Sequence, residues 1–535
     1  LEVGQRHLVG AVNAEVEVIY LVQWSQWNAE AHRQRLRTLG GGDAAYPQPR
    51  AHPLSQREEH LLGGRASPQP DGCAIGNLAH RRLRHRALPR GLIRRLPAAH
   101  RCASSWPPCN HVSRLLALTV FARNPATPPA DATAALAAVH RGLAYWQSRD
   151  LQCPNWWYNQ IGVPKILGNT ALLLNADLTP AEREYVANTV LARAKVGAMT
   201  GQNRVWLAAN GIMRAALLDD DKGLEKAAGV IRDEIQVSTS EGIQPDFSFH
   251  QHGPQQQFGN YGMAFAVEIS RWANVLRGTP AAFPPAKIDI LRNYLLQGQD
   301  WVTWRGVMDI SACGRQLFPG SPQHKAGVIG AVMRVMADTD PTRAADYLAF
   351  LKRNFQTPDA PNDLTGARFF WRSDYLIDRQ PAFMASLKMS SDRVVGGETV
   401  NDENLSGRRL ADGATYFYRT GNEYQDIFPV WDWRKIPGTT SLQDNASLEW
   451  PKPDLAAAPA FVGGVSDGHD ACAVMDFHRA GVSAHKAWFF HEDTILCLGA
   501  AIHSDSPDPL VTTLNQCLLT GPITVDREGA AAPET

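Results

Sequence analysis

A long series of amphipathic helical segments, followed by a shift to strand-like alternation, decides which folds are open to this 535-residue chain. Between about residues 106 and 374, apolar residues recur at i, i+3, i+4 and i+7, and short connections containing Gly, Pro and Asp separate the segments. Such segments pack as antiparallel helix pairs in a solenoid or in a closed α/α toroid. After about residue 381 the pattern changes to alternation with aromatic and β-branched residues, which predicts an antiparallel β-sandwich.

These patterns divide the chain into three expected parts. They are an Arg-rich segment over 1–105, a helical domain over 106–378 and an antiparallel β-sandwich domain over 379–535. Residues 1–120 contain 16 Arg, 8 His and no Lys, and the Arg-rich segment sustains neither a helical nor a strand period. It is either a basic arm for a polyanion or, as we expect, a poorly ordered extension. The strand-like pattern continues almost to Thr535, so we expect the β domain to be truncated.

The composition excludes several classes of function. Lys and Arg together number 53, as do Asp and Glu, so the formal net charge is zero and general binding of nucleic acid is not expected. No run of about 18 apolar residues occurs, so no membrane span is predicted. The eight cysteines are too scattered to form a disulfide framework for a chain of this length, and they leave the redox compartment open.

Two polar and aromatic segments in the helical region are candidates for ligand binding. Trp156 and Trp157 are adjacent, and neighbouring side chains on a helix cannot both face one core. At least one of them is therefore expected to face a cleft, where its ring would stack on a sugar; a buried pair beneath a loop is the alternative. Thr200 is the expected N-cap of the next helix, which leaves Asn203 in the first turn. The positive end of the helix there suits a carboxylate, although a local capping role is the alternative for Asn203.

The segment 247–262 carries the most specific pattern. A Gly-Pro step breaks the chain into a loop, and Asn260 is expected to cap a helix that begins at Tyr261. His252 and Tyr261 would then lie on either side of a polar loop. The helix dipole would lower the pKa of the phenol, and the pair would suit proton removal from carbon and protonation of a leaving oxygen.

Charged residues elsewhere can complete such a site. Arg315 follows a glycine in a turn, where it is either a surface residue or a group that lowers the pKa of a tyrosine or binds an anion. Glu398 and Asn401 lie at the expected domain junction, where they could orient that arginine.

Two other chemistries are weighed against this one. His250 and His252 could form a metal-binding pair, but no third ligand follows at a spacing that supports it, so no metal is expected. Glu241 and Asp246 could act as the paired acids of a glycoside hydrolase on an α/α toroid. They lie close together in the sequence and no matching motif surrounds them.

Six segments in this order and spacing resemble polysaccharide lyase family 8, most of all its chondroitin AC lyase branch, with hyaluronate and xanthan lyases as relatives. The resemblance covers about residues 106–535. The segments are NWWYNQIGVPK (155–165), TGQNR (200–204), FSFHQHGPQQQFGNYG (247–262), DISACGR (309–315), ETVNDENLSGRRLADGATYFYRTG (398–421) and PVWDWRKIPGTT (429–440).

The resemblance implies an incomplete α/α toroid followed by antiparallel β-sheets, with the substrate cleft along the toroid. It implies β-elimination on an acidic, uronic-acid-containing polysaccharide, giving 4,5-unsaturated uronate ends without a cofactor or metal. It also implies a secreted or periplasmic protein, although no signal peptide is visible in the sequence, and we expect a monomer.

Matched to the family position by position, four residues of the helical region receive roles. Asn203 corresponds to the asparagine that binds the uronate carboxylate. His252 and Tyr261 correspond to the catalytic histidine and tyrosine, with the same nine-residue separation. Arg315 corresponds to the first arginine of its motif.

Other matched residues support or extend the site. Glu398 and Asn401 correspond to a supporting pair from the β domain. Trp156 and Trp157 correspond to an aromatic patch that stacks on sugar rings, and Trp450 to a further tryptophan of the cleft.

Two positions depart from the family pattern. Pro319 stands where the family has a second arginine, which weakens the support for an ionised tyrosine. A slow enzyme, or a non-catalytic homologue that binds glycosaminoglycan, is therefore the alternative reading. Arg434 stands where the second acid of a cation site would be, beside Asp432, so bound calcium is not expected.

Overall fold

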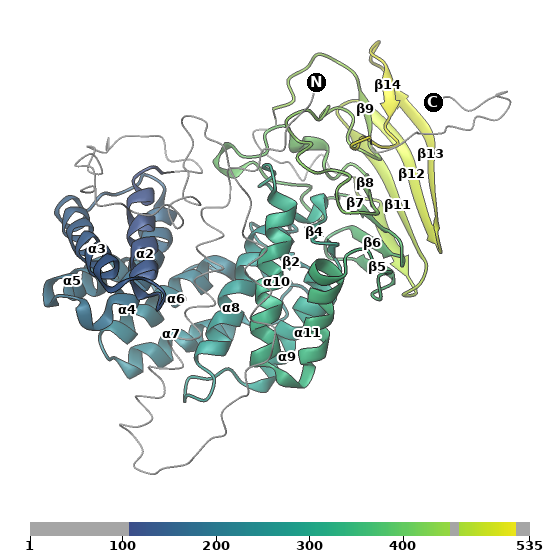
Figure 1. The fold of residues 1–535 in the computed structure, drawn as a ribbon. Coiled ribbons are helices and arrows are strands. Elements are labelled where there is room, and N and C mark those ends of the chain that lie inside the picture. Colours follow the sequence, from purple (N-terminus) through teal and green to yellow (C-terminus); the bar gives the residue numbers. More distant parts are fainter. Residues whose placement is uncertain (1–105, 450–458, 520–535) are drawn as a thin grey trace. The chain divides into compact units, whose positions relative to one another are not determined.

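The computed structural model of the chain describes residues 106–449 and 459–519. The Arg-rich segment 1–105 and the predicted cleft residue Trp450 lie outside the described residues. Helices are followed along the chain by antiparallel sheets, which confirms the expected order of a helical domain and a β domain (Figure 1).

Amphipathic helices make up the first part. In α3 the fixed φ of Pro129 suits the first turn, and Val139, Leu143 and Trp146 form a buried stripe at helical spacing. The pairs α2–α3, α6–α7 and α10–α11 pack as neighbours, as hairpins of consecutive helices do. None of the described helices is long and apolar enough to cross a membrane. The helices are α2 (Cys109–Arg123), α3 (Pro129–Arg149), α4 (Val163–Leu174), α5 (Pro180–Glu184), α6 (Gly201–Leu217), α7 (Asp221–Glu234), α8 (Met263–Val275), α9 (Pro285–Tyr294), α10 (Ser321–Thr339) and α11 (Ala344–Leu351).

Wider π-helical turns lead directly into two of these helices. They are η4 (Tyr158–Gly162) before α4 and η8 (Phe258–Gly262) before α8. The prediction that Asn260 caps a helix at Tyr261 is wrong, because the turn already begins at Phe258 and both residues lie inside it. A π turn changes the direction of the side chains it carries and is frequent at functional sites.

Two four-stranded antiparallel sheets pack face to face and confirm the sandwich. Leu376 and Leu387 of the first sheet share one core with Phe477 and Trp488 of the second. The first sheet has the order β5 (Gly366–Phe370), β6 (Tyr375–Arg379), β7 (Met384–Lys388), β8 (Ala414–Tyr418). The second has the order β10 (Val462–Ser466), β11 (Ala471–Arg479), β12 (Val482–His491), β13 (Thr494–Ser504). Short pairs are β1 (Gly242–Ile243) with β2 (Phe249–His250), β3 (Thr303–Trp304) with β4 (Val307–Met308), and β9 (Thr440–Leu442) with β14 (Leu510–Thr512).

Strands β5 and β6 begin at Gly366 and Tyr375, so strand structure starts earlier in the chain than the change of period indicates. All five residues of β6 are buried. A strand buried on both faces shows no alternation of polar and apolar residues, which explains why the sequence pattern does not reveal it.

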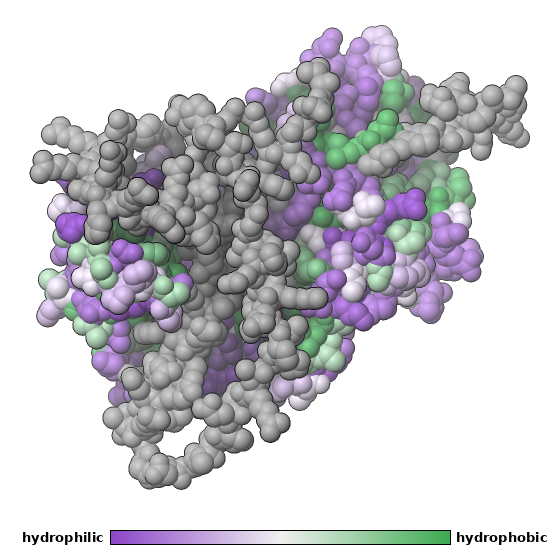
Figure 2. Space-filling model, in the orientation of Figure 1, coloured by the Kyte–Doolittle hydropathy of each residue, from purple (hydrophilic) through white to green (hydrophobic). Residues whose placement is uncertain are grey.

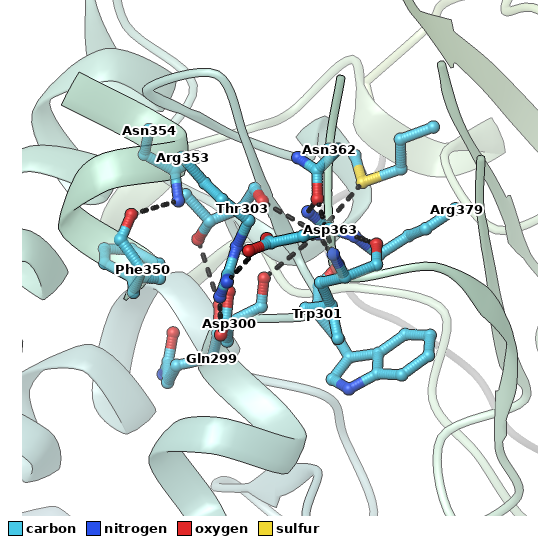
Figure 3. A network of polar contacts seen from close by, with 12 residues as sticks. Gln299, Asp300, Trp301, Thr303, Phe350, Arg353, Asn354, Asn362, Asp363 and Arg379 are labelled. Carbon is cyan, nitrogen blue, oxygen red and sulfur yellow. Dashed lines mark hydrogen bonds and ion pairs between the residues drawn. The ribbon is translucent and has the colours of Figure 1, made fainter. Parts of the chain in front are cut away.

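A buried arginine joins the first sheet to the helical part (Figure 3). Arg379 is fully buried, and its Nη1 donates to the carbonyl oxygens of Asp300, Trp301 and Thr303 at 3.1, 3.0 and 2.9 Å. The Asp300 carboxylate in turn pairs with Arg353 at 2.5 Å. This network fixes β6 against the segment that follows α9.

The outer face of the second sheet is apolar along one row of paired residues. Val465, Cys472, Phe489 and Leu496 are register partners on successive strands, and Val465, Phe489 and Leu496 are exposed. Figure 2 shows apolar surface beside the C-terminal strands, at the upper right of the view.

Candidate active site

Two rings from the segment 247–262 meet at the centre of the site. The His252 and Tyr261 ring centroids lie 4.8 Å apart at an interplanar angle of 64°. His252 follows β2 and has φ of 62°, in the left-handed region that a non-glycine residue adopts only when its surroundings hold it there. The structure therefore brings together the two residues that the sequence places on either side of a polar loop.

Glu241 supplies part of that constraint. Its carboxylate accepts from the backbone N–H groups of His252 and Gly253, at 2.7 and 3.3 Å. The same carboxylate accepts from the Thr200 hydroxyl at 2.5 Å and from the Gln251 side-chain amide. Glu241 thus ties the start of α6 to the histidine loop.

Asp246 is held in a separate network. It accepts from the backbone N–H groups of Ser248 and Arg372 at 2.9 and 2.6 Å. Since Glu241 and Asp246 both serve as acceptors for loop backbone, their contacts do not support the paired-acid alternative.

Glu398 reaches the histidine from the β domain. Its Oε2 accepts from His252 Nδ1 at 2.6 Å and its Oε1 accepts from the Arg315 guanidinium. Burial alone would raise the pKa of this carboxyl group, but the hydrogen bond from His252 and the charge of Arg315 hold its pKa below the ordinary value. The carboxylate therefore requires a proton on Nδ1, and neutral His252 carries its lone pair on Nε2. The imidazole is 32% exposed, which leaves that nitrogen open to a ligand.

Arg315 connects the tyrosine to two carboxylates. It is hydrogen-bonded to Tyr261 and lies 5.5 Å from the centroid of its ring. Its Nε donates to Glu403 at 2.6 Å, in addition to the pair with Glu398. Sequence reasoning missed Glu403. The available signal was a second acid five residues after Glu398 in the same segment.

The predicted lowering of the Tyr261 pKa is wrong in direction. Burial raises the pKa of this phenol, and the positive charge of Arg315 offsets only part of the effect because Glu398 and Glu403 act in the opposite sense. Tyr261 is therefore a neutral phenol in the resting site.

Helix α6 carries Asn203 at its start and, one turn later, a tryptophan that lies near Tyr261. Asn203 lies in the first turn, as predicted, but the Thr200 hydroxyl bonds to Glu241 and does not cap the helix. The Asn203 side-chain oxygen is buried without a partner among the residues that the structure describes. Trp206, one turn further along the same helix face, has its ring centroid 6.1 Å from that of Tyr261. The Asn203 amide is therefore available to a ligand near the tyrosine.

An aromatic series leads away from Tyr261. The centroids of Trp157 and Trp206 lie 5.7 Å apart, so Trp157 is connected to the site through Trp206, which sequence reasoning missed. Trp156 is 37% exposed, in agreement with the expectation that at least one of the adjacent pair leaves the core. Asn401 lies in a left-handed turn three residues after Glu398 and is only partly exposed.

Within the described part of the chain, no group of three or more His, Cys, Asp or Glu residues has the geometry to hold a metal ion. His250 is buried, and its Nε2 lies 3.1 Å from the Ser373 hydroxyl, while His252 bonds to Glu398. The Asp432 carboxylate accepts from the backbone N–H of Arg434 at 3.0 Å.

Comparisons with known proteins point to one family. The description "Polysaccharide lyase family 8, N terminal alpha-helical domain" matches residues 83–350, and the "super-sandwich domain" of the same family matches 365–535. Chondroitinase-AC of Pedobacter heparinus is 32% identical over 446 residues, which are 81% of this chain and 63% of that protein. A hyaluronate lyase of Thermasporomyces composti is 26% identical over 407 residues, 68% of this chain and 52% of that protein.

A solved structure of chondroitinase AC lyase, from a study of enzyme–oligosaccharide complexes, aligns with a TM-score of 0.76 and 29% identity. The alignment covers 84% of this chain and 66% of that one. This chain thus spans about three fifths or less of the length of these two curated relatives.

Proposed function

Because the chain belongs to polysaccharide lyase family 8, we propose that it cleaves a uronic-acid-containing polysaccharide of the chondroitin or hyaluronan type by β-elimination. One observation carries the proposal: His252 and Tyr261 are in edge contact, and Glu398 and Arg315 fix both of them. An imidazole and a phenol held in this way are the acid–base groups that an elimination requires.

The chemical difficulty is the weak acidity of the C5 proton beside an ionised carboxylate. The Asn203 amide would bind that carboxylate and stabilise the charge that develops on it when the proton leaves. A donor placed at a developing charge contributes about 3–4 kcal/mol to the transition state. In the first turn of α6, the side-chain oxygens of Asn203 and Gln202 are both buried without a partner among the residues that the structure describes.

The elimination moves two protons, and the site offers one group for each. His252 would accept the C5 proton on Nε2, because Glu398 already holds the proton on Nδ1. Tyr261 would donate to the departing O4, because burial keeps the phenol protonated. The C5–H and C4–O4 bonds break, a C4–C5 double bond forms, and the product is an oligosaccharide with a 4,5-unsaturated uronate end.

The aromatic series would bind neighbouring sugars. Trp157 and Trp206 extend from Tyr261, and the exposed ring of Trp156 offers a further stacking face. Asn401 would hydrogen-bond the chain from the β domain, and Trp450 would add a further tryptophan to the cleft.

We propose that the protein acts as a monomer outside the cytoplasm. His252, Arg315 and Glu398 all come from one chain, so the site needs no second subunit. A polysaccharide outside the cell does not reach the cytoplasm intact, which supports a secreted or periplasmic location for the enzyme. Sedimentation of the active protein tests the first point.

The test follows the absorbance of the conjugated double bond with chondroitin, hyaluronan and xanthan. Tyr261→Phe should lower the rate at least about 100-fold on these polymers, since the departing oxygen loses its proton donor. A uronate with fluoride at C4 needs no protonation of its leaving group, so the same variant should retain activity on it.

Tyr185→Phe is the matched control, because that phenol bonds to Asp150 away from the site. It should leave the rate unchanged. Full activity of Tyr261→Phe on polymer would refute the role of Tyr261. Binding of polymer by the wild type without any unsaturated product would instead support the non-catalytic homologue.

A further inference from the structure

We infer that Lys325 is a positioning residue of this active site: its buried ammonium holds the turn that carries Tyr261 and supplies the second positive charge that balances the two carboxylates around Arg315. The inference rests on the proposed function, and it adds a residue that contacts neither the histidine nor the tyrosine directly.

The geometry places Lys325 beneath the catalytic turn. It lies in the second turn of α10, is 1% exposed, and its Nζ donates to the Gly259 carbonyl oxygen at 2.5 Å. Gly259 is the second residue of η8, two positions before Tyr261. A hydrogen bond from a charged donor at this point holds the turn η8 in a fixed position relative to α10.

The charges around Arg315 do not balance without Lys325. Arg315 carries one positive charge, while Glu398 and Glu403 carry two negative charges, and both pair with it. The charge of Glu403 also acts on Lys325 and raises its pKa. With Lys325 protonated the four groups sum to zero. With Lys325 neutral they leave one negative charge next to the place where a uronate carboxylate would bind.

The burial of this lysine is itself unfavourable. No carboxylate pairs directly with Lys325 in the described ranges, and burial lowers its pKa to about 8. An ammonium group in such a place destabilises the fold relative to an apolar side chain of similar size. A destabilising charge beside an active site is typical of a residue that serves the reaction.

The charge of Lys325 should therefore disappear as the pH rises through about 8. The groups that act on it are Cys313, Arg315 and Glu403. Burial raises the pKa of the Cys313 thiol to about 12, and Arg315 keeps its charge, so neither titrates near pH 8. Burial also keeps the Tyr261 phenol protonated there. We therefore expect activity to fall above pH 8 as Lys325 loses its proton.

The experiment compares kcat and KM from pH 6 to 10 in the wild type, Lys325→Met and Lys486→Met. Lys486 is the matched control: it is also buried, donates to a carbonyl oxygen (Gly438, at 2.6 Å) and has its pKa lowered to about 8, but it lies in β12. Lys325→Met should lower kcat about 10- to 100-fold at pH 7, as a misplaced catalytic group does, and should remove the fall in activity above pH 8. Lys486→Met should change neither.

Lys325→Arg and Glu403→Gln give independent readouts. Arginine keeps its charge at pH 9, so the alkaline fall should move to higher pH. Glu403→Gln removes the carboxylate that raises the pKa of Lys325, so the alkaline fall should move to lower pH in that variant. The same change removes the negative charge that Lys325 balances, so kcat of Lys325→Met/Glu403→Gln should exceed that of Lys325→Met. If the fall in activity at alkaline pH is unchanged in Lys325→Met, the inference about Lys325 is overturned. The proposed function still holds in that case, provided that the wild type forms unsaturated product. If Lys325→Met does not fold, an unchanged fall in Glu403→Gln overturns the inference. A wild type that forms no product overturns both.

Discussion

The Glu398 carboxylate receives hydrogen bonds from His252 and Arg315, which lie 146 and 83 positions earlier in the chain. One carboxylate therefore sets the protonated nitrogen of the imidazole and the position of the guanidinium next to the tyrosine. Replacing it affects both groups at once, while a change at either donor affects only one.

Glu398→Gln should lower kcat by on the order of 100-fold or more. A glutamine side chain can either donate to or accept from His252 Nδ1, so it no longer forces the proton onto that nitrogen and the lone pair onto Nε2. Glu182→Gln is the matched control, since Glu182 also accepts from a histidine, His140, at 2.8 Å away from the site. Steady-state rates on one polymer measure both variants. Equal losses in the two would contradict the assignment.

We also expect the difference in stability between the wild type and Glu398→Gln to depend on pH. The pKa of Glu398 is lower in the folded state than its ordinary value of 4.5. The Glu398 carboxylate therefore adds to the free energy of unfolding above pH 4.5, and this contribution is lost as the pH falls through the lower folded-state pKa. The free energy of unfolding of the wild type should exceed that of Glu398→Gln by about 1–3 kcal/mol at pH 7. Urea titrations at pH 7, 5 and 4 should show this difference shrink only at the acidic end.

Among single residues of the site, those that lie within recognisable motifs could be predicted from the sequence. His252, Tyr261, Arg315 and Glu398 converge as expected. Glu403 and Lys325 were not foreseen, because an acid in a loop and a lysine in a helix look like surface residues until burial is known. The direction of the Tyr261 pKa shift failed for the same reason: burial is a property of the packed structure.

At the scale of elements, the η8 turn is packed tightly against the chain before Arg315. A Cβ atom on Gly259 would lie 2.8 Å from the Ala312 carbonyl oxygen and 3.0 Å from the Cys313 Cα. Gly259→Ala should therefore displace the turn, lower kcat by about 100-fold and destabilise the protein.

Gly327→Ala provides the comparison within α10. A Cβ there meets no atom within 4 Å, and the position is exposed. Alanine in a helix is about 0.5–1 kcal/mol more favourable than glycine, so this variant should be more stable with unchanged kcat. Thermal unfolding and initial rates measure both; a harmless Gly259→Ala would show that the turn tolerates movement.

The regular helices were predictable because one face of each is buried and the other is solvated. The turn η8 was not, since a single wide turn leaves no periodic signal. Strand β6 was missed for the opposite reason: all five of its residues are buried, so polar and apolar residues do not alternate along it.

At the scale of the whole described unit, the Arg379 network decides whether the two halves of the site meet. Arg379→Met should lower the free energy of unfolding by about 3–5 kcal/mol, because it removes a buried charge from several acceptors. It should also reduce kcat, since Glu398 would reach His252 less accurately. Arg343→Met is the control: its pair with Asp346 is exposed to solvent, so its removal should leave the free energy of unfolding nearly unchanged.

The distance along the chain between His252 and Glu398 has a consequence for how the enzyme comes into being. A ribosome releases the histidine and the tyrosine long before it has made the carboxylate that governs them. Under the proposed function, the site of the growing polypeptide is therefore incomplete until the chain beyond Glu398 has been synthesised and has folded. A proteolytic cut that lets the chain around Glu398 separate from His252 would disrupt the site in the same manner.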